Sequence, residues 1–200
     1  MPRVSQERAR QHRLAIQEAS SRLFRERGIQ AVSVVDLMGA VGLTAGGFYG
    51  HFASKDVLAA VACEAAFDES RNRWRKRAEG KASREGLDAI VSGYLTRRNR
   101  DDPGDACPSA TLASDVARES ADAPVREAYI KGIEDQIEKL ASLQGARDPN
   151  TARQRAMTQL ALLVGAMTLA RATTGSALSD DFLATAKTSL TAESALQGAS

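Results

Sequence analysis

The sequence is poor in cysteine, in aromatic residues and in long hydrophobic stretches. Its two cysteines, Cys63 and Cys107, lie far apart and have no partner at metal-ligand spacing. This argues against a disulfide framework or a zinc site and favours a reduced, cytoplasmic setting. The longest purely apolar run, residues 160–167, is too short to span a bilayer, and the arginine-rich amino terminus lacks the apolar segment of a secretory signal. The sequence therefore predicts a cytoplasmic protein with no metal and no cofactor.

Signals of catalysis are also scarce. No paired-carboxylate motif, glycine-rich phosphate loop or metal-ligand spacing stands out. An enzyme with Cys107 as nucleophile would need a base beside it, but the only histidines, His12 and His51, lie far from it along the chain. We therefore expect no catalytic residues and a protein that is not an enzyme.

Charge is nearly balanced over the chain but is distributed unevenly. The formal net charge is +2, so the total gives no argument for nucleic acid. Residues 1–55, however, carry eight basic and four acidic side chains, which leaves the remaining residues slightly acidic. This asymmetry is typical of a small basic head on a neutral body.

The sequence is rich in Ala, Leu, Arg and Glu, and apolar residues recur at helical spacing. Nothing in it indicates a strand. We expect an all-α fold of about nine helices, including helices near residues 8–27, 108–119, 151–173 and 180–196. A helix end and a connector are expected within the charged segment 71–84, and polar loops at 99–105 and 145–150.

Residues 33–58 have the pattern of a helix-turn-helix. Ser33 caps a short helix, and Asp36 completes a capping box with it. Gly42 makes the turn, and Thr44 caps a second short helix. In a helix-turn-helix the second helix lies in the major groove of DNA.

Residues 13–58 resemble the DNA-binding domain of the tetracycline-repressor (TetR/AcrR) family of transcriptional regulators. The most specific part is the spacing Phe48-Tyr49-x-His51-Phe52-x-x-Lys55-x-x-Leu58. Met38, Gly39 and Gly47 depart from the residues common in the family, which bears on base preference rather than on membership. The resemblance is carried by Arg13, Ala19, Leu23, Phe24, Gly28, Ser33, Val34, Leu37, Ala40, Gly42, Leu43, Gly46, Phe48, Tyr49, His51, Phe52, Lys55 and Leu58.

The resemblance implies a three-helix DNA-binding head at residues 1–55 and a helical ligand-sensing and dimerisation body at 56–200. The implied function is that of a homodimeric repressor, released from a palindromic operator by a small hydrophobic or electrophilic effector. An all-helical protein–protein adaptor without specific DNA binding is the alternative.

The chemistry of the head supports DNA contact. Hydroxyls at helix N-termini attract phosphate oxygens, Tyr49 can hydrogen-bond a phosphate, and adjacent glycines let a helix backbone approach base edges closely. The alternatives are that Tyr49 is a core aromatic and that His51 is an ordinary surface histidine. The expected DNA-contact residues are Ser33, Thr44, Ala45, Gly46, Gly47, Tyr49, His51 and Lys55.

The body offers two further expectations. The middle of the helix at 151–173 is apolar on every side, so it needs cover on every side. With the helix at 180–196 it predicts a self-complementary dimer seam; a fully buried helix in a monomer is the alternative. By resemblance, the body binds a small inducer, with pocket candidates at Tyr94, Cys107, Leu112, Met157, Leu160 and Val164. These residues could equally be plain core, and Cys107 either a thiol sensor or a buried apolar filler.

Overall fold

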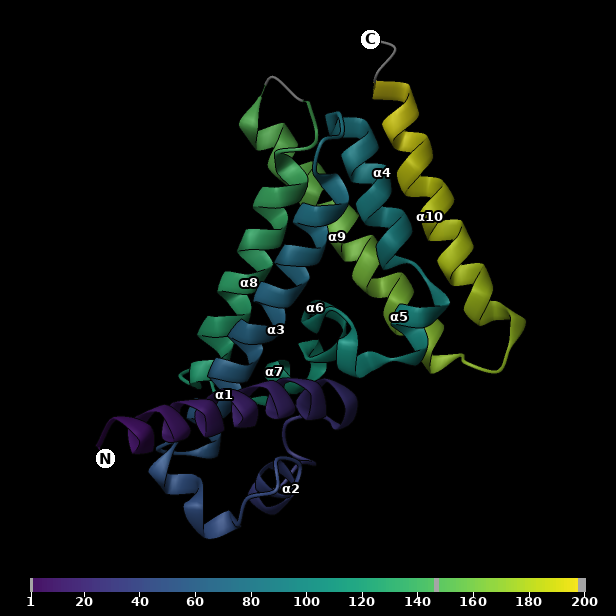
Figure 1. Cartoon of the computed structure of the whole chain (residues 1–200). Coiled ribbons are helices and arrows are strands. Elements are labelled where there is room, and N and C mark those ends of the chain that lie inside the picture. The colour runs from purple at the N-terminus through teal and green to yellow at the C-terminus, as the bar shows by residue number, and fades with distance from the viewer. Residues whose placement is uncertain (1, 146–147, 198–200) are drawn as a thin grey trace. The chain divides into compact units, whose positions relative to one another are not determined.

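The computed structural model describes residues 2–145 and 148–197, and this part of the chain is helical without a strand (Figure 1). The all-α class is confirmed. The sequence analysis expected about nine helices, whereas the described residues form ten α-helices and two short 3-10 helices. In order they are α1 (Pro2–Arg27), α2 (Val34–Gly39), η1 (Ala45–Gly50), α3 (Lys55–Ala78), α4 (Ser83–Tyr94), α5 (Arg97–Asp101), η2 (Pro103–Asp105), α6 (Pro108–Thr111), α7 (Ala113–Arg118), α8 (Pro124–Ala141), α9 (Pro149–Ala172) and α10 (Ala177–Gln197).

Backbone contacts divide the chain into two compact units. The first contains residues 1–68 and 103–132, and the second contains residues 69–102 and 133–200. Helices α3 and α8 therefore contribute residues to both units. The predicted domain boundary at residue 55, between a DNA-binding head and a ligand-sensing body, is a functional division and stays a prediction.

The head of the first unit is built on local signals that the sequence displays. Gly28 ends α1 with φ of +87°, a left-handed conformation that glycine adopts without strain. The predicted capping box at the start of α2 is confirmed, since Ser33 and Asp36 exchange hydrogen bonds through backbone and side chain. Phe48 and Phe52 are buried, as their spacing predicts. These residues stabilise the segment 28–52, which contains α2, the turn and η1.

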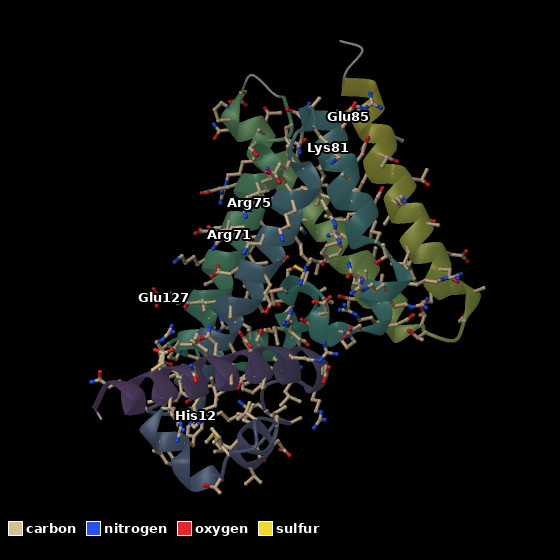
Figure 2. All side chains as sticks on the ribbon, in the orientation of Figure 1. His12, Arg71, Arg75, Lys81, Glu85 and Glu127 are labelled. Carbon is tan, nitrogen blue, oxygen red and sulfur yellow. The ribbon has the colours of Figure 1, made fainter. Side chains whose placement is uncertain are left out.

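Helix α3 ends inside the charged segment at 71–84, where the sequence predicts a helix end and a connector. It continues to Ala78, and residues 79–82 connect it to α4. The first part of this charged segment is therefore helical and has a buried stripe. Ser70, Trp74 and Ala78, four residues apart, are buried, while Arg71 and Arg75 are exposed on its outer side (Figure 2).

The segment at 97–105 also differs from expectation, since α5 and η2 occupy most of the predicted polar loop. The hydroxyl of Thr96 caps α5 by accepting a hydrogen bond from the backbone N–H of Asn99. The Asn99 amide in turn donates to the backbone oxygens of Gly93 and Tyr94. Side-chain capping thus supplies the helical order that the local composition does not suggest.

In the second unit, an ion cluster joins α5 to α10. Asp180 accepts hydrogen bonds from Arg97 at 3.0 and 2.7 Å and from Arg100 at 3.0 Å. Arg100 also donates to the hydroxyl of Ser179 at 3.0 Å. The hydrogen bonds from Arg97, supported by the charge of both arginines, lower the pKa of Asp180. The carboxylate therefore stays ionised at neutral pH and holds α5 against the start of α10.

Candidate nucleic-acid interface

The helix-turn-helix consists of α2, a turn at Gly42 and η1. Gly42 has φ of +71°, which allows the sharp turn that the sequence predicts. The second helix of the pair, expected to be α-helical, is instead the 3-10 helix η1. Three of its six residues are glycines, and glycine costs about 1 kcal/mol relative to alanine in a helix. This composition explains why a short, tighter helix forms there.

Tyr49 is the most prominent side chain of η1. It is 75% exposed, and its ring packs edge-on against buried Phe48 with centroids 5.3 Å apart. The alternative that Tyr49 is a core aromatic is therefore wrong. Phe48 anchors the helix from below while Tyr49 presents its ring and hydroxyl to solvent.

The remaining predicted contact residues lie on the same short stretch of surface. Thr44 occupies the N-cap position of η1, but its side chain makes no cap hydrogen bond, so that part of the prediction is wrong. Lys55 is the first residue of α3. Ser54 caps this helix, because its hydroxyl accepts a hydrogen bond from the backbone N–H of Val57. Ser33, Thr44, Gly46, Gly47 and Tyr49 are exposed, and Ala45, His51 and Lys55 are half-buried.

Ser33 differs from Thr44 in its surroundings. Its hydroxyl and its backbone N–H both bind the carboxylate of Asp36. These two hydrogen bonds lower the pKa of Asp36, so a negative charge lies beside Ser33 at neutral pH. A carboxylate at that position opposes a phosphate. Of the two hydroxyls, Thr44 is the better placed to contact a phosphate group.

Arg13 of α1 is a residue whose structural role the sequence analysis did not identify. Its guanidinium donates to the backbone oxygen of His51 and lies 4.3 Å from the centroid of the Phe52 ring. The His51 ring also contacts the ring of His12, with centroids 6.0 Å apart. Helix α1 thereby holds the corner between η1 and α3 through a hydrogen bond and a cation–π contact.

The predicted ligand residues are placed differently from one another. Tyr94, Cys107, Leu112 and Leu160 are buried, Val164 is half-buried, and Met157 is 49% exposed. Cys107 and Leu112 belong to the first unit and the other four to the second. A shared pocket for these six residues stays a prediction.

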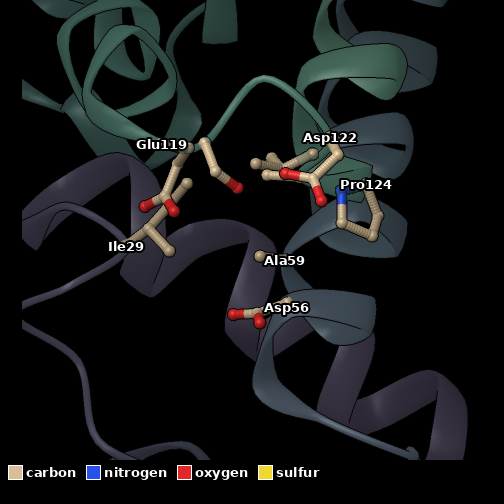
Figure 3. A pocket seen from close by; sticks show the side chains of 9 residues that line it. Ile29, Asp56, Ala59, Glu119, Asp122 and Pro124 are labelled. Atoms are coloured by element: carbon tan, nitrogen blue, oxygen red, sulfur yellow. The ribbon is translucent and has the colours of Figure 1, made fainter.

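The first unit has a cavity of about 190 Å³ beside the start of α3 (Figure 3). It is lined by none of the six predicted ligand residues. Three carboxylates, those of Asp56, Glu119 and Asp122, surround it together with apolar atoms of Ile29 and Pro124. Glu119 accepts a hydrogen bond from the Gln30 amide at 2.7 Å. An acidic cavity of this kind disfavours anionic ligands.

The part of the chain that the structure describes has neither a metal site nor a membrane-spanning helix. Within residues 2–145 and 148–197, no group of three or more His, Cys, Asp or Glu side chains is arranged to hold a metal ion. None of the described helices combines the length and the apolar character needed to cross a bilayer.

Known proteins provide an independent comparison. Residues 16–62 match the model of the bacterial regulatory proteins of the tetR family, which covers the helix-turn-helix and the first turns of α3. No protein with curated annotation is detectably similar in sequence.

Solved structures resemble the chain over most of its length. The reduced form of E. coli NemR is 20% identical, with a TM-score of 0.76 over 90% of this chain and 95% of that chain. A TetR-family transcriptional regulator from Cytophaga hutchinsonii is 22% identical, with a TM-score of 0.76 over 93% of this chain and 96% of that one. A TetR transcriptional regulator from Chloroflexus aurantiacus is 24% identical, with a TM-score of 0.69 over 93% and 95%.

At these identities the structural likeness shows the fold, and the match at residues 16–62 identifies the head. The helix-turn-helix with its exposed Tyr49 is thus a DNA-binding element of a transcriptional regulator. Residues 16–62 thus form a head of the type found in the tetR family of bacterial regulatory proteins.

Proposed function

We propose that the protein is a homodimeric repressor that binds a palindromic operator and is released from it by a small hydrophobic or electrophilic effector. The observation that carries this proposal is the exposed surface of η1, with Tyr49 75% exposed above an anchored Phe48, inside a tetR-family head. The whole process would take place in the cytoplasm.

The expected contacts with DNA follow from the chemistry of the exposed groups. The hydroxyls of Thr44 and Tyr49 and the ammonium of Lys55 are donors for phosphate oxygens. Bare backbone at Gly46 and Gly47 allows η1 to approach the base edges. Phosphate contacts fix the position of the head on the duplex, and base contacts supply its sequence preference.

The proposed dimer uses the outer face of α9 together with α10. The inner face of α9 is buried in its own unit, for example at Leu163 and Met167. Its outer face exposes Met157, Leu162 and Leu169, an unusual number of large apolar side chains for one helix. A two-fold seam there would hold two heads about 34 Å apart, the spacing of successive major-groove faces.

Release by an effector follows from differential binding. A ligand that prefers a dimer with a different head spacing lowers operator affinity by its preference between the two states. Apolar side chains dominate the candidate residues, with Leu112, Leu160 and Val164 among them, which favours a hydrophobic effector.

The DNA-binding proposal is tested by replacing Tyr49 and Lys55 separately with alanine. Each change is expected to weaken binding to a selected operator, and Lys55→Ala is expected to reduce the slope of log affinity against log salt by about one per head. Gel shifts over a salt series measure both quantities. Lys81→Ala, which removes an exposed lysine outside the head, is the matched control and should leave both unchanged (Figure 2).

Unchanged operator affinity in both head variants would contradict the proposal. In that case the helix-turn-helix would not contact DNA, and the adaptor function would take its place.

An electrophilic effector is the second candidate, favoured by one contact. The thiol of Cys107 lies 2.9 Å from the hydroxyl of Ser109, which can donate to a thiolate. The similar E. coli structure is that of the reduced form of NemR. Both thiols are buried, Cys107 at 6% and Cys63 at 1% exposure, and burial raises the pKa of the Cys63 thiol to about 12.

We expect N-ethylmaleimide to alkylate Cys107 before Cys63, because a thiol with a raised pKa holds little thiolate at neutral pH. Mass spectrometry of the treated protein gives the order. Operator binding should be lost on treatment of the wild-type protein and of Cys63→Ser, and retained by Cys107→Ser. A response that survives in Cys107→Ser rules out this thiol as the sensor.

A further inference from the structure

The helix-turn-helix carries almost none of the side chains that usually identify bases. In the major groove, Arg, Lys, Asn and Gln recognise purines through pairs of hydrogen bonds, and Asp or Glu can accept from cytosine. Residues 34–50, which form α2, the turn and η1, contain no Arg, Lys, Asn, Gln or Glu. Their one charged residue, Asp36, uses its carboxylate to cap α2 through Ser33.

What this segment offers instead is apolar. Of the large hydrophobic side chains that the structure describes, Tyr49 at 75% and Val35 at 67% are the most exposed. Both belong to the helix-turn-helix, Tyr49 in η1 and Val35 in α2. The two helices pack together, and an added Cβ at Gly47 would lie 3.6 Å from the terminal methyl of Met38.

The rest of the η1 surface is backbone. A Cβ added at Gly46 or at Gly50 would meet no protein atom within 4 Å. Neither glycine is required by a left-handed conformation, because neither has positive φ. The space above η1 is therefore open, and a base edge can come as close as the main chain allows.

An exposed apolar side chain has one distinctive partner in the major groove, the C5-methyl group of thymine. We propose that this regulator recognises its operator chiefly through thymine methyl groups, with Val35 and Tyr49 as the side chains that contact them. Val35, which the sequence analysis did not select, is thereby a specificity-determining residue. This inference rests on the proposed function, in which η1 enters the major groove.

The test compares two versions of one duplex. A fragment is first selected with the full-length protein from a random-sequence duplex pool. It is then synthesised in two versions, one with thymidine and one with deoxyuridine at every thymidine position. Deoxyuridine keeps the base pairing but lacks the C5-methyl group. Because removing one methyl from an apolar contact weakens binding by about fourfold, loss of several contacts should weaken wild-type binding by about tenfold or more.

Two variants distinguish recognition of the thymine methyl groups from the overall affinity for DNA. Val35→Ala should reduce the thymidine-to-deoxyuridine ratio of affinities by about fourfold, since one apolar partner of the methyl groups is gone. Lys55→Gln should weaken binding to both duplexes equally and leave the ratio unchanged. Val35 is exposed, so circular dichroism should show that Val35→Ala keeps the native helix content.

The outcomes are distinguishable. A wild-type ratio within twofold of one would overturn recognition through methyl groups, although the protein binds DNA. A wild-type ratio near ten that Val35→Ala leaves unchanged would overturn the assignment of Val35. Failure to enrich any fragment from the pool would instead contradict the proposed function itself.

Discussion

Replacing Gly132 with alanine is expected to destabilise the protein by about 3 kcal/mol. A Cβ at this position of α8 would lie 2.2 Å from Cγ and 2.3 Å from Cδ2 of Phe67. The Phe67 ring is buried and packs edge-on against Tyr129, with centroids 5.5 Å apart, so it cannot turn away. Urea unfolding measures the loss, which should lower the melting temperature by roughly 10 °C for a chain of this length.

The control for this prediction is Gly93→Ala. Its Cβ would also be close to a side chain, 2.2 Å from Nε of Arg77, but a long flexible side chain can move aside. We expect a clearly smaller loss of stability there. In Phe67→Ala/Gly132→Ala the two losses should be less than additive, because the first change removes the ring that the second one meets. Additive losses of stability would show that the effect of Gly132→Ala does not arise from a clash with the Phe67 ring.

The second large effect is expected from Leu169→Glu on the outer face of α9. Leu169 is 47% exposed in the single chain, so a carboxylate there should leave the fold intact. In the proposed dimer seam, however, the same carboxylate would be buried without a partner. We expect a monomer by light scattering. Operator affinity should fall about a hundredfold or more, because two linked heads bind far more tightly than one.

Ile130→Glu is the matched control, since it also places a carboxylate on an exposed apolar site but on α8. It should leave the assembly and the operator affinity unchanged. A dimeric Leu169→Glu protein would show that α9 does not form the seam. A monomeric wild-type protein would contradict the dimer altogether.

Features fixed by neighbouring residues could be predicted from the sequence. The left-handed glycines Gly28 and Gly42, and the capping box of Ser33 with Asp36, depend on residues within four positions of one another. Such short-range signals are visible in the order of residues. They sufficed for the helix-turn-helix and for the family resemblance of the head.

Features that join distant segments could not be predicted. Arg13 meets the His51 carbonyl 38 residues away, and Arg97 meets Asp180 83 residues away. Neither pairing has a local sequence signal, because any arginine can face any acceptor until the fold brings them together. Exposure is a tertiary property too, and for that reason Val35, unlike Tyr49, was identified only from the structure.

The open space at Gly46 and Gly50 has a consequence for how this regulator can evolve. Since a Cβ added at either position would have no protein atom within 4 Å, a small side chain can be introduced there without a clash at its first carbon. Mutations there can alter target choice while the protein core remains as it is. Duplicated copies of this gene could therefore diverge toward separate promoters by single substitutions, without first having to acquire compensating stability.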